Sequence, residues 1–162
     1  MKIELNVSED VAKELLEKYG KSWKPWRAKL GNRYLVVSIT GGWDSIMEEN
    51  SAMDNYRYSI GNYFQTEEEA EQAKLINKAK SRLNFKMLEL NEGWTPDWKD
   101  KEQKKHFPYY DYANEEWRVA LCQTSKYLVD YDFYTDESAK QFIEEMKLDL
   151  ELVFNINQQK ND

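Results

Sequence analysis

The alternation of apolar and polar residues predicts short strands in both halves of the chain. In the first half the runs are rich in β-branched and aromatic residues and are separated by glycine and polar turns. They cover residues 33–40, 43–48 and 56–60. The second half repeats this arrangement at residues 107–111, 117–122 and 127–133. The pattern therefore predicts a three-stranded antiparallel sheet in each half.

Apolar residues spaced by threes and fours predict a long helix after each set of strands. Thr66 and Glu69 have the spacing of a capping box, and Thr135 is an N-cap residue for the second helix. Gly93 provides a stop for the first helix. We therefore expect one helix of about 25 residues over 66–91 and another from 135 toward 153.

Two nine-residue stretches, 64–72 and 133–141, share the pattern Phe-x-Thr-(Asp/Glu)-Glu-x-Ala-x-Gln. A Trp-x-Pro element also occurs twice, at 23–25 and 94–96. These repeats predict an α+β fold built by internal duplication of a unit with a three-stranded antiparallel sheet and one helix. The expected units are 23–93 and 94–154. A short strand and helix in 1–22 would precede them, and a flexible polar tail, 155–162, would follow.

Composition limits the classes of protein that fit. The 162 residues are 41% hydrophobic and 14% aromatic, which is enough for one domain or two small lobes with a core. The net charge of −7 disfavours nucleic-acid binding overall, although a local basic patch stays open. The single cysteine excludes an internal disulfide and a multi-cysteine zinc site. No apolar run resembles a secretion signal or a membrane span, so we expect a cytoplasmic protein.

The candidate catalytic groups are few. His106 is the only histidine and Cys122 the only thiol, but His106 follows two lysines and Cys122 continues an apolar strand pattern. No glycine-rich phosphate loop is present. Asp130 and Asp132 could bind a hard metal ion, but they are better explained as the solvent face of a strand. The sequence therefore predicts a protein that is not an enzyme and has no metal site and no cofactor.

The most distinctive candidate for binding is the segment 21–33, which contains five cations and no acid. Trp23 and Trp26 lie among cations that include Arg27 and Lys29, as in proteins that bind single-stranded nucleic acid. However, Trp94 and Trp98 repeat the element in acidic surroundings. A feature shared by both units with opposite charge favours a structural role, with each Trp closing one end of its lobe. The binding candidates are Trp23, Trp26, Arg27, Lys29, Trp94 and Trp98.

The predicted helix over 66–91 also carries a basic stretch between residues 74 and 86. Glu67 and Glu71 precede Lys74 and Lys78 on one helical face, so Glu–Lys pairs explain much of this charge. We expect this stretch to be a solvated helix face.

Several of these motifs together resemble small uncharacterised proteins encoded by bacteriophages and integrated mobile elements. The matching stretches are Trp-x-Pro, Arg-Tyr at 57–58, Gly-Asn-Tyr-Phe at 61–64, Thr-Glu-Glu-Glu-Ala-Glu at 66–71 and Asn-Glu-Gly-Trp-Thr-Pro-Asp-Trp at 91–98. The resemblance covers about 55–150 and leaves out 1–22. It implies an accessory protein that binds a host protein, with inhibition of a CRISPR nuclease or another defence system as one outcome. Exposed aromatic residues would supply anchors, and carboxylates would imitate phosphates. The alternative is a nucleic-acid-binding module that uses 21–33.

Overall fold

The computed structural model describes residues 26–123 and 131–156, which form an α+β protein with three helices and two antiparallel hairpins. The strand and helix expected in 1–22 lie outside the described residues, as do 157–162 of the expected tail. The elements in chain order are β1 (Arg33–Val37), β2 (Trp43–Met47), α2 (Ala52–Ser59), α3 (Glu67–Asn91), β3 (Lys105–Asp111), β4 (Glu116–Cys122) and α4 (Asp136–Val153).

Each hairpin has a continuous antiparallel register. In the first, β1 and β2 pair from Arg33 opposite Met47 to Val37 opposite Trp43. The turn is closed by the backbone N–H of Ser38, which donates to the carbonyl of Gly42 at 2.9 Å. In the second, β3 and β4 pair over seven positions from residues 105 and 122 to residues 111 and 116. These four strands confirm the predicted ones to within three residues at each end.

The predicted third strands are not found in the described residues. The prediction at 56–60 is wrong, because residues 52–59 form helix α2. A capping box between Ser51 and Asp54 starts this helix. Phe64 forms only a single antiparallel bridge, to Leu35 of β1. In the second half, 124–130 lie outside the described residues, and Phe133 contributes one antiparallel bridge to β3.

Both long helices begin and end as their sequences predict. Thr66 accepts a hydrogen bond from the backbone of Glu69, whose carboxylate accepts one from the Thr66 N–H in return. Helix α3 then runs for 25 residues until Glu92 and Gly93, both with positive φ, turn the chain away. Thr135 caps α4 by accepting from the backbone of Ser138 at 3.0 Å, without the reciprocal carboxylate bond.

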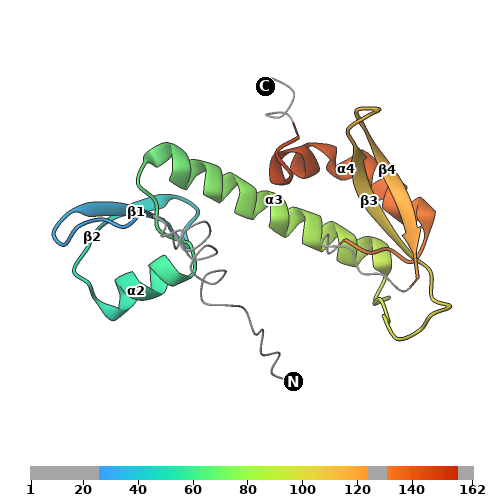
Figure 1. Ribbon diagram of the computed structural model, residues 1–162, viewed down its shortest axis with the longest axis horizontal. Coiled ribbons are helices and arrows are strands. Elements are labelled where there is room, and N and C mark those ends of the chain that lie inside the picture. Colours follow the sequence, from blue (N-terminus) through green and yellow to red (C-terminus); the bar gives the residue numbers. More distant parts are fainter. Residues whose placement is uncertain (1–25, 124–130, 157–162) are drawn as a thin grey trace, which may run out of the picture.

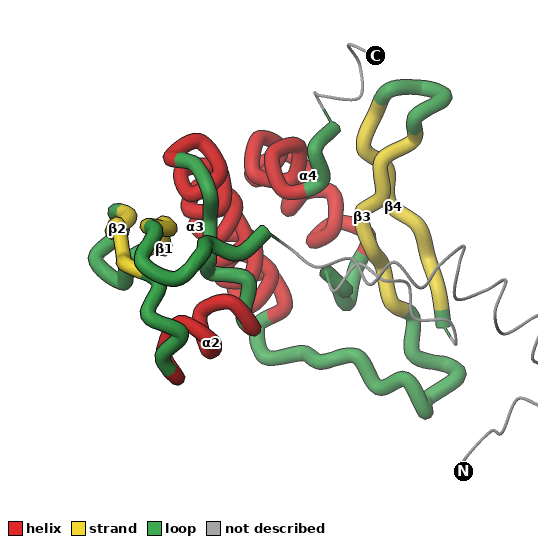
Figure 2. Tube along the Cα trace, turned by 60° about the vertical axis from the view of Figure 1, so that its left-hand side comes forward, coloured by secondary structure: helices red, strands yellow, loops and turns green. Residues whose placement is uncertain are grey.

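The two helices lie side by side between the hairpins (Figures 1 and 2). We call residues 26–66, with β1, β2 and α2, the first lobe. The second lobe consists of residues 94–123 and 131–156, with β3, β4 and α4. Helix α3 contacts β1 on one side and α4 on the other, and α4 in turn contacts β3 and β4. The layers are therefore first hairpin, α3, α4 and second hairpin.

Two separate apolar clusters hold these layers together. The larger one joins α3 to α4 and the rest of the second lobe; its fully buried members include Leu83, Phe133, Phe142 and Leu150. The smaller one lies in the first lobe, with Ala28, Tyr34 and Val36 as its buried members. Within the described ranges, no helix has the length and apolar character needed to cross a bilayer.

Candidate functional site

Arg27, a predicted binding residue, contacts the protein's own carboxylates. Its guanidinium donates to the two carboxylate oxygens of Glu48, through Nε at 3.3 Å and Nη2 at 3.0 Å. It also lies over the ring of Tyr58, 5.2 Å from the ring centroid. The Trp26 ring lies 5.8 Å from that of Tyr63. Arg27 and Trp26 therefore help to hold the first lobe together, while Trp23 lies outside the described residues.

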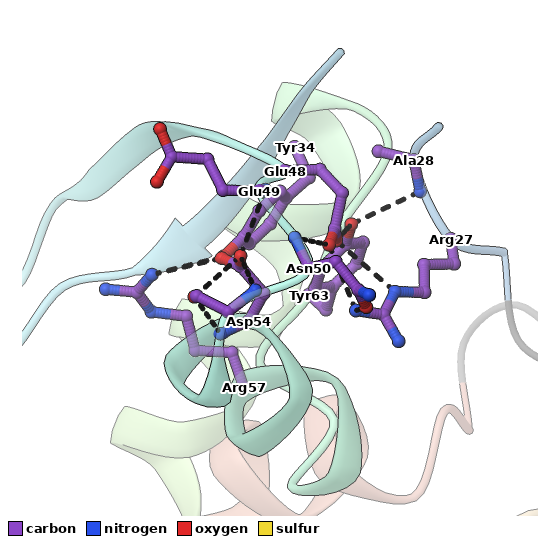
Figure 3. A network of polar contacts seen from close by, with 10 residues as sticks. Arg27, Ala28, Tyr34, Glu48, Glu49, Asn50, Asp54, Arg57 and Tyr63 are labelled. Atoms are coloured by element: carbon purple, nitrogen blue, oxygen red, sulfur yellow. Dashed lines mark hydrogen bonds and ion pairs between the residues drawn. The ribbon is translucent and has the colours of Figure 1, made fainter. Parts of the chain in front are cut away.

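Glu48 is the acceptor at the centre of this cluster (Figure 3). It is 2% exposed, and besides Arg27 it accepts from the hydroxyl of Tyr63 at 2.5 Å and from the backbone N–H of Asn50 at 2.8 Å. The hydrogen bond from Arg27 keeps the pKa of Glu48 below its ordinary value. Burial, together with donation to Glu48, raises the pKa of Tyr63. Glu48 is thus ionised and Tyr63 is neutral at pH 7.

Asp54 forms a second, similar cluster beside the first (Figure 3). The Tyr34 hydroxyl donates to one carboxylate oxygen at 2.5 Å, and the hydroxyl of Ser51 donates to the other at 2.7 Å. Two backbone N–H groups, from Glu49 and Ser51, complete the shell. The hydrogen bonds from Tyr34 and Ser51 hold the pKa of Asp54 well below its ordinary value. Arg57 donates to the Tyr34 hydroxyl at 3.1 Å and lies 3.8 Å from the Asp54 carboxylate.

The tyrosines connect the two clusters. The rings of Tyr34 and Tyr63 are stacked, with centroids 3.8 Å apart and planes 9° from parallel. Each hydroxyl donates to a different buried carboxylate, and each carboxylate has an arginine beside it. We call this arrangement the tyrosine–carboxylate network. Because its carboxylates accept several hydrogen bonds each, it is suited to fixing the lobe rather than to accepting a substrate proton.

Two further cations of the segment 21–33, Lys29 and Arg33, lie in the described residues. Lys29 is exposed. Arg33 donates to the carbonyl of Ser45 at 3.1 Å. Leu35 directs its backbone N–H and carbonyl to Phe64. Ser45 lies opposite Leu35 in β2, so its own backbone groups point away from β1, to the outer edge of β2. Arg33 therefore covers part of a sheet edge.

The second pair of predicted binding tryptophans also makes internal contacts. The Trp94 ring lies 5.8 Å from that of Tyr134. Trp98 lies under the ammonium of Lys105, which is 5.2 Å from the ring centroid. Lys105 is fully buried and donates to the carbonyls of Asp100, Gln103 and Gln123, at 2.9–3.1 Å. These contacts anchor the loop before β3. The structure thus divides those predicted residues that it describes between two lobes and does not bring them into one site.

His106 and Cys122 do not form a nucleophilic pair. In the register of the second hairpin, Cys122 lies opposite Lys105, and His106 lies opposite Leu121. Neighbouring positions along a strand face opposite sides of a sheet, so the thiol and the imidazole are on different faces. Burial also raises the pKa of the Cys122 thiol, which disfavours the thiolate. Among the residues that the structure describes, no group of three or more His, Cys, Asp or Glu side chains could hold a metal ion.

The basic stretch of α3 is largely neutralised by carboxylates. Lys74 pairs with Glu71 in the same helix. Two cations reach across to α4 instead: Arg82 donates to both carboxylate oxygens of Asp149, and Lys86 lies 2.6 Å from Glu145. The sequence predicted pairing within one helix. The pairs between the helices were missed because their partners lie about 60 residues further along the chain.

Large apolar side chains are exposed on both helices of this pair. Phe85 follows the fully buried Leu83 by two residues, and Leu148 precedes the fully buried Leu150 by two. Each is therefore turned about 200° around its helix from the core. Phe85 is 73% exposed and Leu148 is 80% exposed. Both adjoin the ion pairs between the helices, and Leu88 extends the surface along α3. We call Phe85, Leu88 and Leu148 the outer helical face.

The sequence contained a signal for this face that its analysis missed. Phe85 and Leu88 lie outside the apolar stripe that defines the core side of α3, so α3 does not need their side chains to pack on the core. Comparison of the chain with family models, with curated proteins and with solved structures gives no match.

Proposed function

We propose that this chain is a non-enzymatic accessory protein of a bacteriophage or mobile element and that it binds a host protein. The observation that carries the proposal is the outer helical face. Two large apolar side chains on neighbouring helices, Phe85 and Leu148, are more exposed than buried. Apolar groups that are gathered on one face and bordered by charges are typical of surfaces that bind other proteins.

The helices beneath this face form a rigid base for binding. The larger apolar cluster packs α3 against α4, and the ion pairs Arg82–Asp149 and Lys86–Glu145 link the two helices on their exposed side. A partner would thus meet side chains whose backbone is already ordered, which reduces the entropy lost on binding. Phe85, as the aromatic member, is the expected anchor.

The alternative, nucleic-acid binding through 21–33, is supported by the exposure of Lys29 and by Trp26, which is 40% exposed. It is weakened because Arg27 and Arg33 already donate hydrogen bonds to other groups of the first lobe. A phosphate bound by Arg27 would have to compete with a buried carboxylate that would then lose its cation. The protein-binding proposal requires no such rearrangement.

A pull-down of the tagged full-length chain from host lysate, with and without nuclease, separates the two functions. We expect a stoichiometric protein that survives nuclease, is lost with Phe85→Glu and Leu148→Glu, and is kept with Lys29→Glu. Recovery that disappears with nuclease, or that depends on Lys29 and not on the outer helical face, would overturn the proposal. Arg27 is not suitable for this test, because its replacement leaves Glu48 buried without its cation.

The resemblance to phage and mobile-element proteins supports a more specific outcome, the inhibition of a host defence system such as a CRISPR nuclease. Purified chain added to the captured partner should lower the partner's activity. The Phe85→Glu variant should have no such effect. A captured partner whose activity is unchanged would support binding without inhibition.

We also propose that the two halves arose by internal duplication. In both halves an antiparallel hairpin is followed by a single bridge at a phenylalanine and then by a Thr-capped helix. The bridging residues, Phe64 and Phe133, are the first residues of the repeated nine-residue pattern. Helix α2, inserted between β2 and Phe64, is the main departure of the first half from this order.

A further inference from the structure

The outward side of α3 carries a regular stripe that extends beyond the apolar face. Its members lie four, three, four and three residues apart, and they are Lys74, Lys78, Ser81, Phe85 and Leu88. This spacing places all five on one side of the helix and is the spacing at which a second helix can follow the first. The stripe is cationic at its N-terminal end and apolar at its C-terminal end.

A groove lies over the cationic end. It has a volume of about 330 Å³ and runs between the turn of the first hairpin and α3. Residues 37, 38 and 41 form one wall, and the other wall comes from α3, including Lys78, Ser81 and Arg82. A Cβ at Gly41 would lie 3.9 Å from the Lys78 Nζ, so the turn approaches this ammonium closely.

Two cations of α3 differ from the others. Lys74, Arg82 and Lys86 each have a carboxylate partner, whereas Lys78 and Lys80 form no ion pair with the part of the chain that the structure describes, and of these two only Lys78 lines the groove. Lys78 is nevertheless exposed in a groove beside two further cations. A carboxylate brought by another molecule would complete its pairing at little cost.

From these features we propose that the partner contributes an amphipathic helix that lies along α3. Acidic residues at one end of this helix contact Lys78 in the groove, and apolar residues one to two turns away pack on Phe85 and Leu88. The proposal rests on the proposed function, because it assigns the chemistry of the protein partner. It concerns a helix lying along α3, so it can fail while a partner of another shape still binds at Leu148 of α4.

Photo-crosslinking in the full-length chain tests the inference. A benzophenone amino acid replaces Phe85 in one variant and the exposed Glu144 of α4 in another, and each is irradiated in host lysate. We expect position 85 to give one crosslinked protein, whose attached peptide has carboxylates within about two helical turns of an apolar stripe. Adding Lys78→Glu should lower the yield about tenfold or more, because like charges would then meet. Lys80→Glu, two residues away on another face of α3, should leave the yield unchanged.

Three results would overturn the proposal. The first is a crosslink from position 85 to a second copy of this chain or to its own residues 1–25. The second is an attached peptide without carboxylates, or a crosslinking yield from position 85 that Lys78→Glu and Lys80→Glu lower equally. The third is a partner captured from position 144 and not from 85, which would keep the proposed function and remove this inference. If neither position captures a protein, both proposals fail.

Discussion

The two halves of the chain share the order of hairpin, single bridge and Thr-capped helix, with α2 inserted in the first half, yet different chemistry holds their lobes together. The second lobe is packed around apolar groups, with Phe133, Phe142 and Leu150 fully buried. The first lobe has only Ala28, Tyr34 and Val36 as its buried apolar members, and it buries Glu48 and Asp54 beside them. One arrangement of the chain can thus be stabilised mainly by apolar burial or partly by a hydrogen-bonded network.

This difference has consequences for stability. Apolar packing does not depend on protonation, whereas the tyrosine–carboxylate network requires two ionised carboxylates. Such a network is stable only while every member keeps its partner, since a half-paired buried charge is costly. Substitutions should therefore destabilise the second lobe mainly by leaving cavities among its apolar side chains. They should destabilise the first lobe mainly by leaving buried polar groups without their hydrogen-bond partners.

The largest effect is expected from a cavity in the second lobe. Phe142 is fully buried, with its ring centroid 4.8 Å from that of Phe133. Phe142→Ala should lower the free energy of unfolding by about 3–5 kcal/mol. Urea unfolding followed by circular dichroism measures this loss. Phe85→Ala, at an exposed position of α3, should cost about 0.5 kcal/mol or less. Equal costs for the two variants would contradict the assignment of the core.

Loss of a carboxylate from the first lobe should come next. Asp54→Ala removes the acceptor of the Tyr34 and Ser51 hydroxyls and should cost about 3 kcal/mol. Hydrogen exchange should show the loss in the amides of β1 and α2. Asp44→Ala, at an exposed position of β2, is the matched control and should leave exchange unchanged. If both variants behave alike, the network does not stabilise the lobe.

The second lobe also buries charged residues, Lys105 and Asp132, and Lys105 tests how far the contrast between the lobes extends. Lys105→Met keeps most of the buried stem but leaves three carbonyls without their donor. We expect a loss of about 2 kcal/mol in urea unfolding. The exposed neighbour provides a control, since Lys104→Met should have little effect. A neutral Lys105→Met variant would show that the loop before β3 does not need its cation.

The smallest effect is expected from the ion pair between the helices. Arg82 and Asp149 are paired in a solvent-accessible position, where water and salt screen their attraction. A double-mutant cycle with Arg82→Gln and Asp149→Asn should give a small favourable coupling at low salt that disappears at high salt. A coupling that persists at high salt would show that this pair contributes more to the free energy of unfolding than its exposure suggests.

Local signals predicted the elements better than the site. The capping box determines the start of the prediction for α3, because Thr66 and Glu69 act within one turn, and Gly93 determines its end. The alternation of Tyr56, Tyr58 and Ile60 led to a false strand, because the signal at Ser51 and Asp54 for a helix of only eight residues was overlooked. Short helices have few apolar positions, so their period is difficult to distinguish from that of a strand.

The tyrosine–carboxylate network could not be predicted in this way. Its two carboxylates, Glu48 and Asp54, are among 30 acidic residues, and nothing local distinguishes them. Their partners Tyr34 and Arg27 are 20 and 21 residues away along the chain. Only the packing of β1 against α2, and of the segment around Arg27 against the end of β2, brings these groups together.

Hydrogen exchange of the two lobes as a function of pH tests the central contrast most directly. The folded pKa values of Glu48 and Asp54 are both lowered, so the opened first lobe binds more protons than the folded one in acid. Their contribution is complete above the ordinary carboxyl pKa of about 4 and is lost as the pH falls below it. After correction for the intrinsic exchange rate at each pH, we expect the backbone amides of β1 and β2 to lose protection in acid, while those of β3, β4 and α4 keep most of theirs. Equal loss in both lobes would contradict it.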